Sequence, residues 1–373
     1  EISQRVSPKL SQTSNNIFLN EKLLARVKSI YDKKEQLNLS TEDAKLLEDL
    51  YESFKANGAT LNKDDKEKYR KLSMDLSMLT LQFDQNALKD KNRFELLITD
   101  ENELSGLPES ARDAAAMLAK SKDKDGWLFN LSAPSYIPFM RYSDKRDLRE
   151  KMYREYMSVG NKGDEFDNKD IIKKIVNIRL EIAQLMGFKN YAEYALEHTM
   201  AKNSANVYKL LNQLLEAYKP IAINEYNAVE GFALGTEKEN ITVMPWDWSY
   251  YSNKLKDKKF NINEEMLRPY FELEQVKKGV FGLAEKLYGI TFRKNTEIPV
   301  YHKEVEAFEV FDKDGKFLAV LYTDFHPRPG KRAGAWMTSY KDQWIDKKTG
   351  KNSRPHVSVV MNFTKPTENK PAL

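Results

Sequence analysis

Over most of the chain before residue 290, apolar residues recur at spacings of three and four, which is the pattern of one-sided helices. Ser40 can cap a helix that Gly58 ends, and Asn62 can begin a longer helix. Pro220 is expected to kink or break a helix that opens at Ser204, because proline removes a backbone donor and crowds the preceding turn. Further helices are expected near residues 108–118, 148–156, 171–187 and 276–289.

The pattern changes near residues 290–300. Apolar and polar residues alternate along Val305–Phe311, Asp312–Gly315 supplies a turn, and Lys316–Tyr322 returns, which predicts a β-hairpin. A third strand is expected at His356–Phe363. The sequence therefore predicts a mainly α-helical fold with a small β-sheet or hairpin region near its C-terminal end.

Composition narrows the class of protein. The chain has 373 residues, of which 41% are hydrophobic and 11% aromatic, enough for one large helical body or two domains. Its 60 basic and 56 acidic residues nearly cancel, and no dense basic stripe favours a nucleic-acid partner. The absence of cysteine excludes disulfides, thiol nucleophiles and cysteine-bound metals.

No apolar run reaches the roughly 18 residues that a membrane span needs, so no membrane partner is expected. The chain starts at Glu1 without an initiator methionine or a signal-type apolar region, which suggests that it begins inside a longer product. The compartment stays open, with the cytoplasm favoured over the periplasm or secretion.

The four histidines do not form a recognisable metal site. A zinc-protease helix carries two imidazoles four residues apart with a carboxylate base beside them. His302 and Glu306 are four apart, but they lie in strand-like sequence, where no helical metal face can form. No metal is therefore expected to bind this chain alone. The histidines are His198, His302, His326 and His356.

Other catalytic motifs are missing as well. The chain has no G-x-S-x-G nucleophile elbow and no phosphate-binding loop of the G-x-x-x-x-G-K-[ST] type. Asp123–Gly126 and Asp312–Gly315 imitate the start of a calcium loop but lack the bidentate Glu at the right distance, so both are interpreted as turns. No catalytic residue is assigned.

The segment Met244–Tyr251 gathers tryptophan and tyrosine. One interpretation is a packed corner that seats the preceding helix. The other is a wall of a substrate channel, where rigid aromatic rings hold a peptide at low entropic cost. The sequence leaves both open.

Two segments, Asp324–Met337 and Pro355–Lys365, resemble those that lead up to the zinc helix in the thimet oligopeptidase and peptidyl-dipeptidase family of metallopeptidases. The ending Gly-Ala-Trp-Met of the first looks more like the bacterial branch than the animal one. Further segments earlier in the chain are also similar to the family and occur in the same order as in it. They are Leu104–Glu109, Pro134–Met140, Arg146–Arg154, Pro245–Tyr251 and Phe281–Ile290.

The resemblance implies a two-lobed helical peptidase that encloses a deep channel and hydrolyses short unstructured peptides. In the family, an H-E-x-x-H helix and a later Glu hold Zn²⁺, which activates a water for the Glu base of the motif. That helix follows the segment that here ends at Leu373, so no catalytic or metal residue is carried over. Residues 1–295 are expected to form a channel wall, and residues 296–373 the start of the catalytic region.

The role that the resemblance implies for this chain is substrate binding. The family implies a sheet edge that pairs with extended peptide, placed here on Ala333, Gly334, Ala335 and Trp336, whose small residues allow a close backbone approach. The alternative is that they relieve crowding in a turn or core. Lys331 and Arg332 are candidates for the terminal carboxylate of a peptide, or else structural or solvent-facing.

The expected partners are oligopeptides and the remaining C-terminal part of the same protein, with Zn²⁺ bound only by the whole enzyme. The expected activity is release of C-terminal dipeptides, and the isolated chain is expected to be inactive. An endo-acting oligopeptidase of the same family is one alternative. A non-catalytic helical peptide-binding or scaffold protein is the other.

Overall fold

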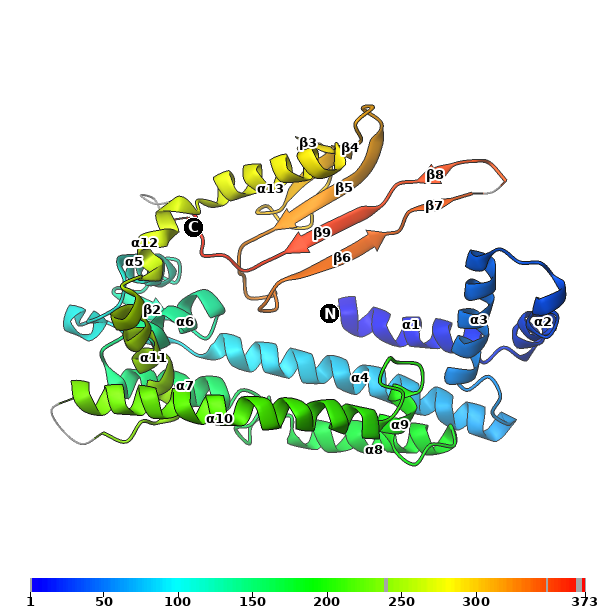
Figure 1. Ribbon diagram of the computed structural model, residues 1–373, viewed down its shortest axis with the longest axis horizontal. Helices are drawn as coiled ribbons and strands as arrows, with labels where there is room; N and C mark the ends of the chain where they lie inside the picture. Colours follow the sequence, from blue (N-terminus) through cyan, green and yellow to red (C-terminus); the bar gives the residue numbers. More distant parts are fainter. Residues whose placement is uncertain (1, 238–240, 347, 367–370, 373) are drawn as a thin grey trace. The chain divides into compact units, whose positions relative to one another are not determined.

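The computed structural model describes residues 2–237, 241–346, 348–366 and 371–372. Helices make up most of it, and the strands of its largest sheet all follow residue 290, so the predicted mainly α-helical fold is confirmed (Figure 1). The chain divides into two compact units, Glu1–Lys89 with Gly160–Asn224 and Asp90–Val159 with Glu225–Leu373. The division at residue 295 into channel wall and catalytic region stays a prediction. None of the described helices is long and apolar enough to cross a membrane.

The first unit consists of helices whose ends follow the predicted capping residues. The Ser40 hydroxyl accepts the backbone N–H of Asp43 at 3.1 Å, and Gly58 follows that helix with φ at +81°. The Asn62 side chain accepts the N–H of Asp65 at 2.9 Å. The elements are α1 (Ile2–Phe18), α2 (Glu21–Tyr31), the 3₁₀ turn Lys34–Gln36, α3 (Thr41–Ala56), most of α4 (Lys63–Arg93), α8 (Lys169–Leu185), α9 (Tyr191–Leu196) and the first part of α10 (Ser204–Thr236).

The helix α10 runs through Pro220 without interruption, so of the two outcomes predicted there, a kink or a break, the break is wrong and the kink stays a prediction. A proline inside a helix removes one hydrogen bond and crowds the carbonyl four residues earlier. Here residues 209–219 before it and 221–230 after it are rich in Leu, Ala, Glu and Ile, which extend a helix once it has formed.

The second unit combines helices with all of the strands that the structure describes. Its helical core gathers buried apolar side chains around Phe129, Phe139 and Met152. A short antiparallel pair, β1 (Leu96–Ile98) and β2 (Trp127–Phe129), adds to this core. The helical elements are the 3₁₀ turns Glu101–Leu104 and Arg268–Tyr270, α5 (Glu109–Lys120), α6 (Ala133–Tyr142), α7 (Arg146–Met157), α11 (Pro245–Phe260), α12 (Glu264–Leu267) and α13 (Leu273–Tyr288).

The aromatic segment at the start of α11 packs inside this unit. Trp246, Tyr250 and Tyr251 are buried, and Asp247 between them is fully buried against two arginines of α7. The burial of these four residues supports the interpretation of Met244–Tyr251 as a packed corner, whereas Trp248 in the same segment is 37% exposed.

Five strands form the main sheet in the order β3-β4-β5-β9-β6. The predicted hairpin is confirmed, because β4 and β5 pair antiparallel and Gly315 donates its N–H to the Asp312 carbonyl in the turn. The third predicted strand, β9, ends at Val360 and lies parallel to β5. The strands are β3 (Thr291–Lys294), β4 (Glu306–Phe311), β5 (Phe317–Asp324), β6 (Trp336–Lys341) and β9 (His356–Val360).

The helix α13 covers one face of this sheet at its β3–β4 side (Figure 1). The Phe281 ring of α13 stacks on Phe292 of β3 with centroids 4.1 Å apart and meets the Phe308 ring of β4 edge-on at 5.2 Å. A second, smaller pair, β7 (Trp344–Ile345) with β8 (Asn352–Ser353), extends the β6–β9 hairpin beyond the sheet.

Candidate functional site

The strand β6 is an edge of the main sheet. It pairs with β9 along one side, with Trp336 opposite Val360 and Thr338 opposite Ser358, and no strand of the described chain pairs with its other side. Met337 is 64% exposed and Tyr340 53%, so the strand is open to solvent. An open edge presents unpaired N–H and C=O groups that can pair with another extended chain.

The strand begins at Trp336, so of the four residues predicted to form the edge, Ala333, Gly334 and Ala335 lie in the preceding loop instead. The reason is the backbone of Gly334, whose φ is +99°, outside the range of a β-strand. A Cβ atom added at Gly334 would meet nothing within 4 Å, so this glycine serves the backbone turn and does not relieve crowding. The substrate-binding role of these four residues stays a prediction.

The loop between β5 and β6 is fixed at its start by Asp324, a carboxylate that is 1% exposed. Arg328 donates to both of its oxygens at 2.8 Å, Lys331 donates to Oδ1 at 2.9 Å, and the Tyr301 hydroxyl donates to Oδ2 at 2.9 Å. Burial alone would raise the pKa of Asp324, but the hydrogen bonds from these cations and the hydroxyl outweigh it and hold the pKa well below its usual range. Asp324 is therefore charged, and both of its carboxylate oxygens accept hydrogen bonds from side chains of the same region.

Lys331 is a structural residue of this loop. Its ammonium donates to Oδ1 and the carbonyl of Asp324 and to the carbonyl of His326, and its side chain is 2% exposed. Because an ammonium has three donors, none remains for the carboxylate of a peptide. The structural alternative for Lys331 is thus confirmed, whereas Arg332 is exposed and stays a candidate.

The far end of the loop is held by Asn362, which follows β9. Its side-chain amide donates to the carbonyl of Arg332 at 3.0 Å and to that of Gly334 at 2.7 Å. In the middle of the loop, the Asn92 side chain donates to the Pro329 carbonyl at 2.6 Å. The loop is thus bonded at its start, middle and end, which preorganises the first residues of β6.

Aromatic rings brace the loop and β6 from one side of the sheet. The Tyr340 ring of β6 lies 6.1 Å from Tyr301 and 5.9 Å from Tyr322 of β5, measured between centroids. The Tyr322 hydroxyl is 3.2 Å from Nδ1 of His356 on β9. Burial and the nearby Lys341 lower the pKa of His356, which favours its neutral form.

Sequence reasoning missed the roles of Tyr301, Asp324, Tyr340 and Asn362. Asp324 accepts from a tyrosine 23 residues earlier, and Asn362 binds carbonyls 28 and 30 residues earlier. No spacing rule connects residues so far apart in an irregular segment. The only signal available was that Asp324 opens one of the two distinctive segments.

Each of the four histidines has a different neighbouring residue, and no two of them contact each other in the interactions that follow. His302 accepts the N–H of Glu304, His326 lies near the Phe363 carbonyl, His356 faces Tyr322, and His198 lies 3.7 Å from Glu52. Among the residues that the structure describes, no group of three or more His, Asp or Glu side chains could hold a metal ion. These residues therefore do not supply a ligand set for the zinc that the resemblance implies.

Comparison with known proteins finds relatives among oligopeptidases and dipeptidyl carboxypeptidases. The chain is 34% identical to Oligopeptidase A of Salmonella typhimurium and 33% identical to Dipeptidyl carboxypeptidase of Escherichia coli; both matches cover 100% of the chain, and 55% and 54% of those proteins. It is 36% identical to a probable cytosolic oligopeptidase A of Arabidopsis thaliana over 93% of the chain and 51% of that protein.

The chain thus spans about half the length of the curated relatives it matches. The profile of peptidase family M3 matches residues 139–373, which include the whole main sheet, the loop after Asp324 and the edge strand β6. The chain belongs to peptidase family M3.

Proposed function

We propose that this chain is the N-terminal and central part of a cytoplasmic zinc metallopeptidase that hydrolyses short unstructured peptides and releases C-terminal dipeptides. The observation that carries the proposal is the open edge of β6, preceded by a loop that Asp324, Asn92 and Asn362 hold in place. A peptide can add to such an edge as a further strand through main-chain hydrogen bonds. Rigid support of the edge lowers the entropy that binding must offset.

In this proposal, zinc is bound by the full-length protein and not by the 373-residue chain alone. When bound, it would activate the attacking water and polarise the scissile carbonyl. The described residues of this chain would hold and align the peptide, with Ala333, Gly334, Ala335 and Trp336 at the start of the docking edge. The ligands of the metal would come from the part of the protein that corresponds to the remaining length of the relatives.

An endo-acting oligopeptidase is the second candidate, because a relative of similar identity carries the name Oligopeptidase A. The two activities differ in whether the enzyme needs a free peptide carboxylate. A dipeptide-releasing enzyme measures from the C-terminus, whereas an endopeptidase does not.

We expect the full-length protein with zinc to release dipeptides from a free-acid octapeptide and to cleave the C-terminally amidated octapeptide at least about tenfold more slowly, a difference of about 1.4 kcal/mol in transition-state binding. Mass spectrometry of the products over time measures both. The 373-residue chain alone, given zinc, should cleave neither peptide. Equal cleavage of both at internal bonds would support the endopeptidase, and zinc-dependent cleavage by the chain alone would contradict the proposal.

Proline substitutions test whether β6 is the docking edge. Met337 and Thr338 are adjacent on β6, so the N–H of one points to β9 and that of the other points outward. Proline at the inward position removes a ladder bond and lowers stability, whereas proline at the outward position removes only the N–H that a peptide would use. We expect the more stable of the two variants to raise KM for peptides about tenfold, or about 1.4 kcal/mol.

The matched controls are Met337→Ala and Thr338→Ala, which keep the backbone N–H and should leave KM within about twofold. Urea unfolding ranks the stability of all four variants. If the more stable proline variant retains the KM of its alanine counterpart, the peptide does not pair with this edge.

A further inference from the structure

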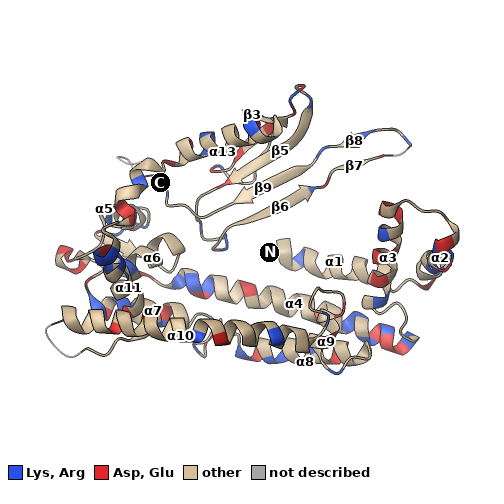
Figure 2. Cartoon of the chain, viewed as in Figure 1, with Lys and Arg blue, Asp and Glu red and all other residues tan. Residues whose placement is uncertain are grey.

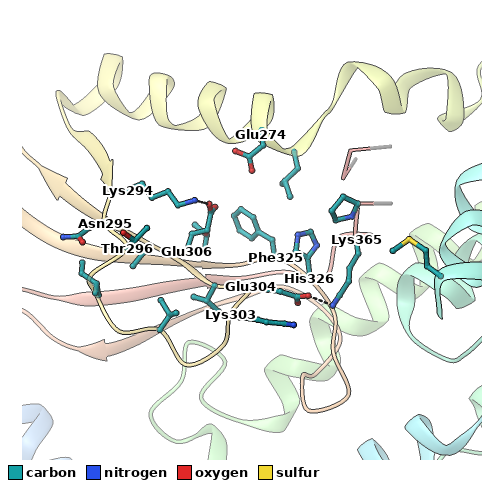
Figure 3. A pocket seen from close by; sticks show the side chains of 18 residues that line it. Glu274, Lys294, Asn295, Thr296, Lys303, Glu304, Glu306, Phe325, His326 and Lys365 are labelled. Atoms are coloured by element: carbon teal, nitrogen blue, oxygen red, sulfur yellow. Dashed lines mark hydrogen bonds and ion pairs between the residues drawn. The ribbon is translucent and has the colours of Figure 1, made fainter. Parts of the chain in front are cut away.

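The helix α13 has two apolar sides, and only one of them is covered by the part of the chain that the structure describes. On the covered side, the Phe281 ring packs on two phenylalanines of the sheet, and Glu274 points toward a cavity of about 700 Å³ between the helix and the sheet (Figure 3). Another side carries four apolar residues that are spaced four, three and four apart and are between 39% and 63% exposed. These residues, which we call the α13 stripe, are Val276, Val280, Leu283 and Leu287.

The pattern of the α13 stripe is that of a contact between two helices. A helix on the surface of a globular protein normally has one apolar face, which it turns toward the core, so a second apolar stripe is typical of a helix that packs on two sides. The four-three-four spacing is the spacing of a seam in which the side chains of one helix insert between those of another. Charged side chains occupy only part of α13 and leave much of the helix uncharged (Figure 2). The partner that fits this stripe is therefore a helix.

Small residues beside the stripe leave room for such a helix to come close. Gly279 and Ala284 occupy the positions that flank a seam of this spacing. Gly279 is exposed, and a Cβ atom added to it would meet nothing within 4 Å. Glycine weakens a helix relative to alanine, because it loses more conformational freedom on folding. No described neighbour needs the space at Gly279, and a partner backbone that approaches closely would use it.

The last described residue, Ala372, lies at the beginning of the same helix. The backbone N–H of Leu273, the first residue of α13, donates to the Ala372 carbonyl at 2.9 Å, and Ala372 is 9% exposed. Residues that follow Ala372 in a longer protein therefore start beside the first turn of α13. Val276, the first residue of the stripe, is three residues or about 4.5 Å along the helix axis from Leu273. A later segment can thus reach the stripe without a long linker.

The size of the stripe favours a segment of the same protein over a separate protein. A stable interface between two proteins buries about 800 Å² on each partner, contributed by about 20–30 residues a side. The α13 stripe has four side chains. A tethered segment needs less contact area, because the tether keeps it at a high effective concentration. The chain covers 55% and 54% of two of its relatives, so proteins of this family are long enough to contain such a segment.

We propose that a helix from the part of the protein that follows residue 373 packs along the α13 stripe. Apolar residues of that helix, three and four apart, insert between those of the stripe, and its backbone comes closest at Gly279. The inference rests on the proposed function, in which this chain is the N-terminal and central part of a longer protein. One side of α13 then packs on the sheet that carries β6 and the other on the later part, so α13 fixes the position of the two relative to each other.

Cysteine labelling of the full-length protein tests the contact. Residues 1–373 contain no cysteine, so mass spectrometry of the labelled peptide identifies a single cysteine introduced into α13. The matched control is Glu285→Cys, since Glu285 is exposed on the same helix outside the stripe. We expect Leu283→Cys and Val280→Cys to react with a maleimide at least about tenfold more slowly than the control in the folded protein, because a covered thiol reacts only when the contact opens. In urea, all three should react at the same rate.

Photo-cross-linking identifies what covers the stripe. Lys286 is exposed beside it, and a benzophenone maleimide coupled to Lys286→Cys should form cross-links to residues beyond 373 of the same molecule. A mixture of isotope-labelled and unlabelled protein separates these from cross-links between two copies. Circular dichroism checks that each variant is folded, and the two stripe positions are tested separately so that one remains if the other unfolds.

Two results would overturn the inference. One is equal labelling of the stripe and control cysteines in the folded protein, and the other is cross-links only to residues 2–224 or to a second copy. Neither measurement uses hydrolysis, so the inference and the proposed function can fail separately. A protein that gives the expected labelling and cross-links but releases no dipeptide contradicts the proposed function alone, whereas equal labelling in a protein that releases dipeptides contradicts this inference alone.

Discussion

Replacing Asp324 by Asn is expected to lower the free energy of unfolding by about 3–5 kcal/mol, because it leaves two buried or partly buried cations without their shared anion. The Lys331 and Asp324 side chains are each 2% exposed and the Arg328 side chain 20%, so water can solvate the abandoned charges only in part. The same change frees the loop that leads into β6. In the full-length peptidase that we propose, the KM for peptides is therefore expected to rise more than kcat falls.

The pH dependence of this contribution has a defined direction. The pKa of Asp324 is lowered in the folded protein, so its contribution to stability is fully present above the pKa of an unfolded Asp, about 3.9. It is lost as the pH falls from there through the depressed folded pKa. Wild type and Asp324→Asn should thus differ most at neutral pH and converge in strong acid.

Urea unfolding at several pH values measures the stability, and initial rates on peptides give KM and kcat. Asp314→Asn is the control, because Asp314 is an exposed residue of the β4–β5 turn. It should change stability by less than about 0.5 kcal/mol. An Asp324→Asn protein as stable as that control would show that the loop is not held by this carboxylate.

Replacing Asp247 by Leu is expected to destabilise the second unit by a similar amount, about 3–5 kcal/mol. Asp247 is fully buried and accepts from Arg149 at 2.8 Å, from Arg146 at 2.7 Å and from the N–H of Met244 at 3.1 Å. Arg149 is 1% exposed and stacks over the Tyr250 ring at 4.0 Å, so its charge cannot reach water when Asp247 is removed.

A double variant shows whether the loss of stability comes from removing the Arg149–Asp247 ion pair or from leaving the charge of Arg149 buried without its partner. Arg149→Met combined with Asp247→Leu should recover much of the stability, since apolar side chains of similar size can replace a buried ion pair at little cost. Glu150→Gln, which breaks an exposed pair with Arg154 on the same helix, should cost less than about 1 kcal/mol. If the double variant is no more stable than Asp247→Leu, the buried charge of Arg149 is not the source of the cost.

Local chemistry made much of the fold predictable. Ser40, Asn62 and Gly58 act on backbone groups within a few residues, and the Asp312–Gly315 turn fixes its hairpin in the same way. A break of α10 at Pro220 was one of the two predicted outcomes because the proline was given much weight against the helix-favouring residues on both sides of it.

The site was predictable only in part because its contacts join distant segments. The resemblance pointed to the region of β6, but the strand starts at Trp336 since Gly334 takes a backbone conformation that no spacing rule reveals. Lys331 gave no sign of being buried, because its partner Asp324 acts through a loop whose course depends on Asn362. Side chains that satisfy one another across an irregular loop have no period to detect.

The position of β9 between β5 and β6 determines when the edge strand β6 can form during synthesis. During synthesis, β3, β4 and β5 can pair as soon as they emerge, because each lies beside its neighbour in the chain. The strand β6 emerges next but has no place in the sheet until His356–Val360 is made and lies parallel to β5. The edge strand β6, which we propose to pair with peptide, is thus the last strand of this sheet to find its place during synthesis. A nascent chain that stalls before His356 contains the residues of β6 but cannot form this edge of the sheet.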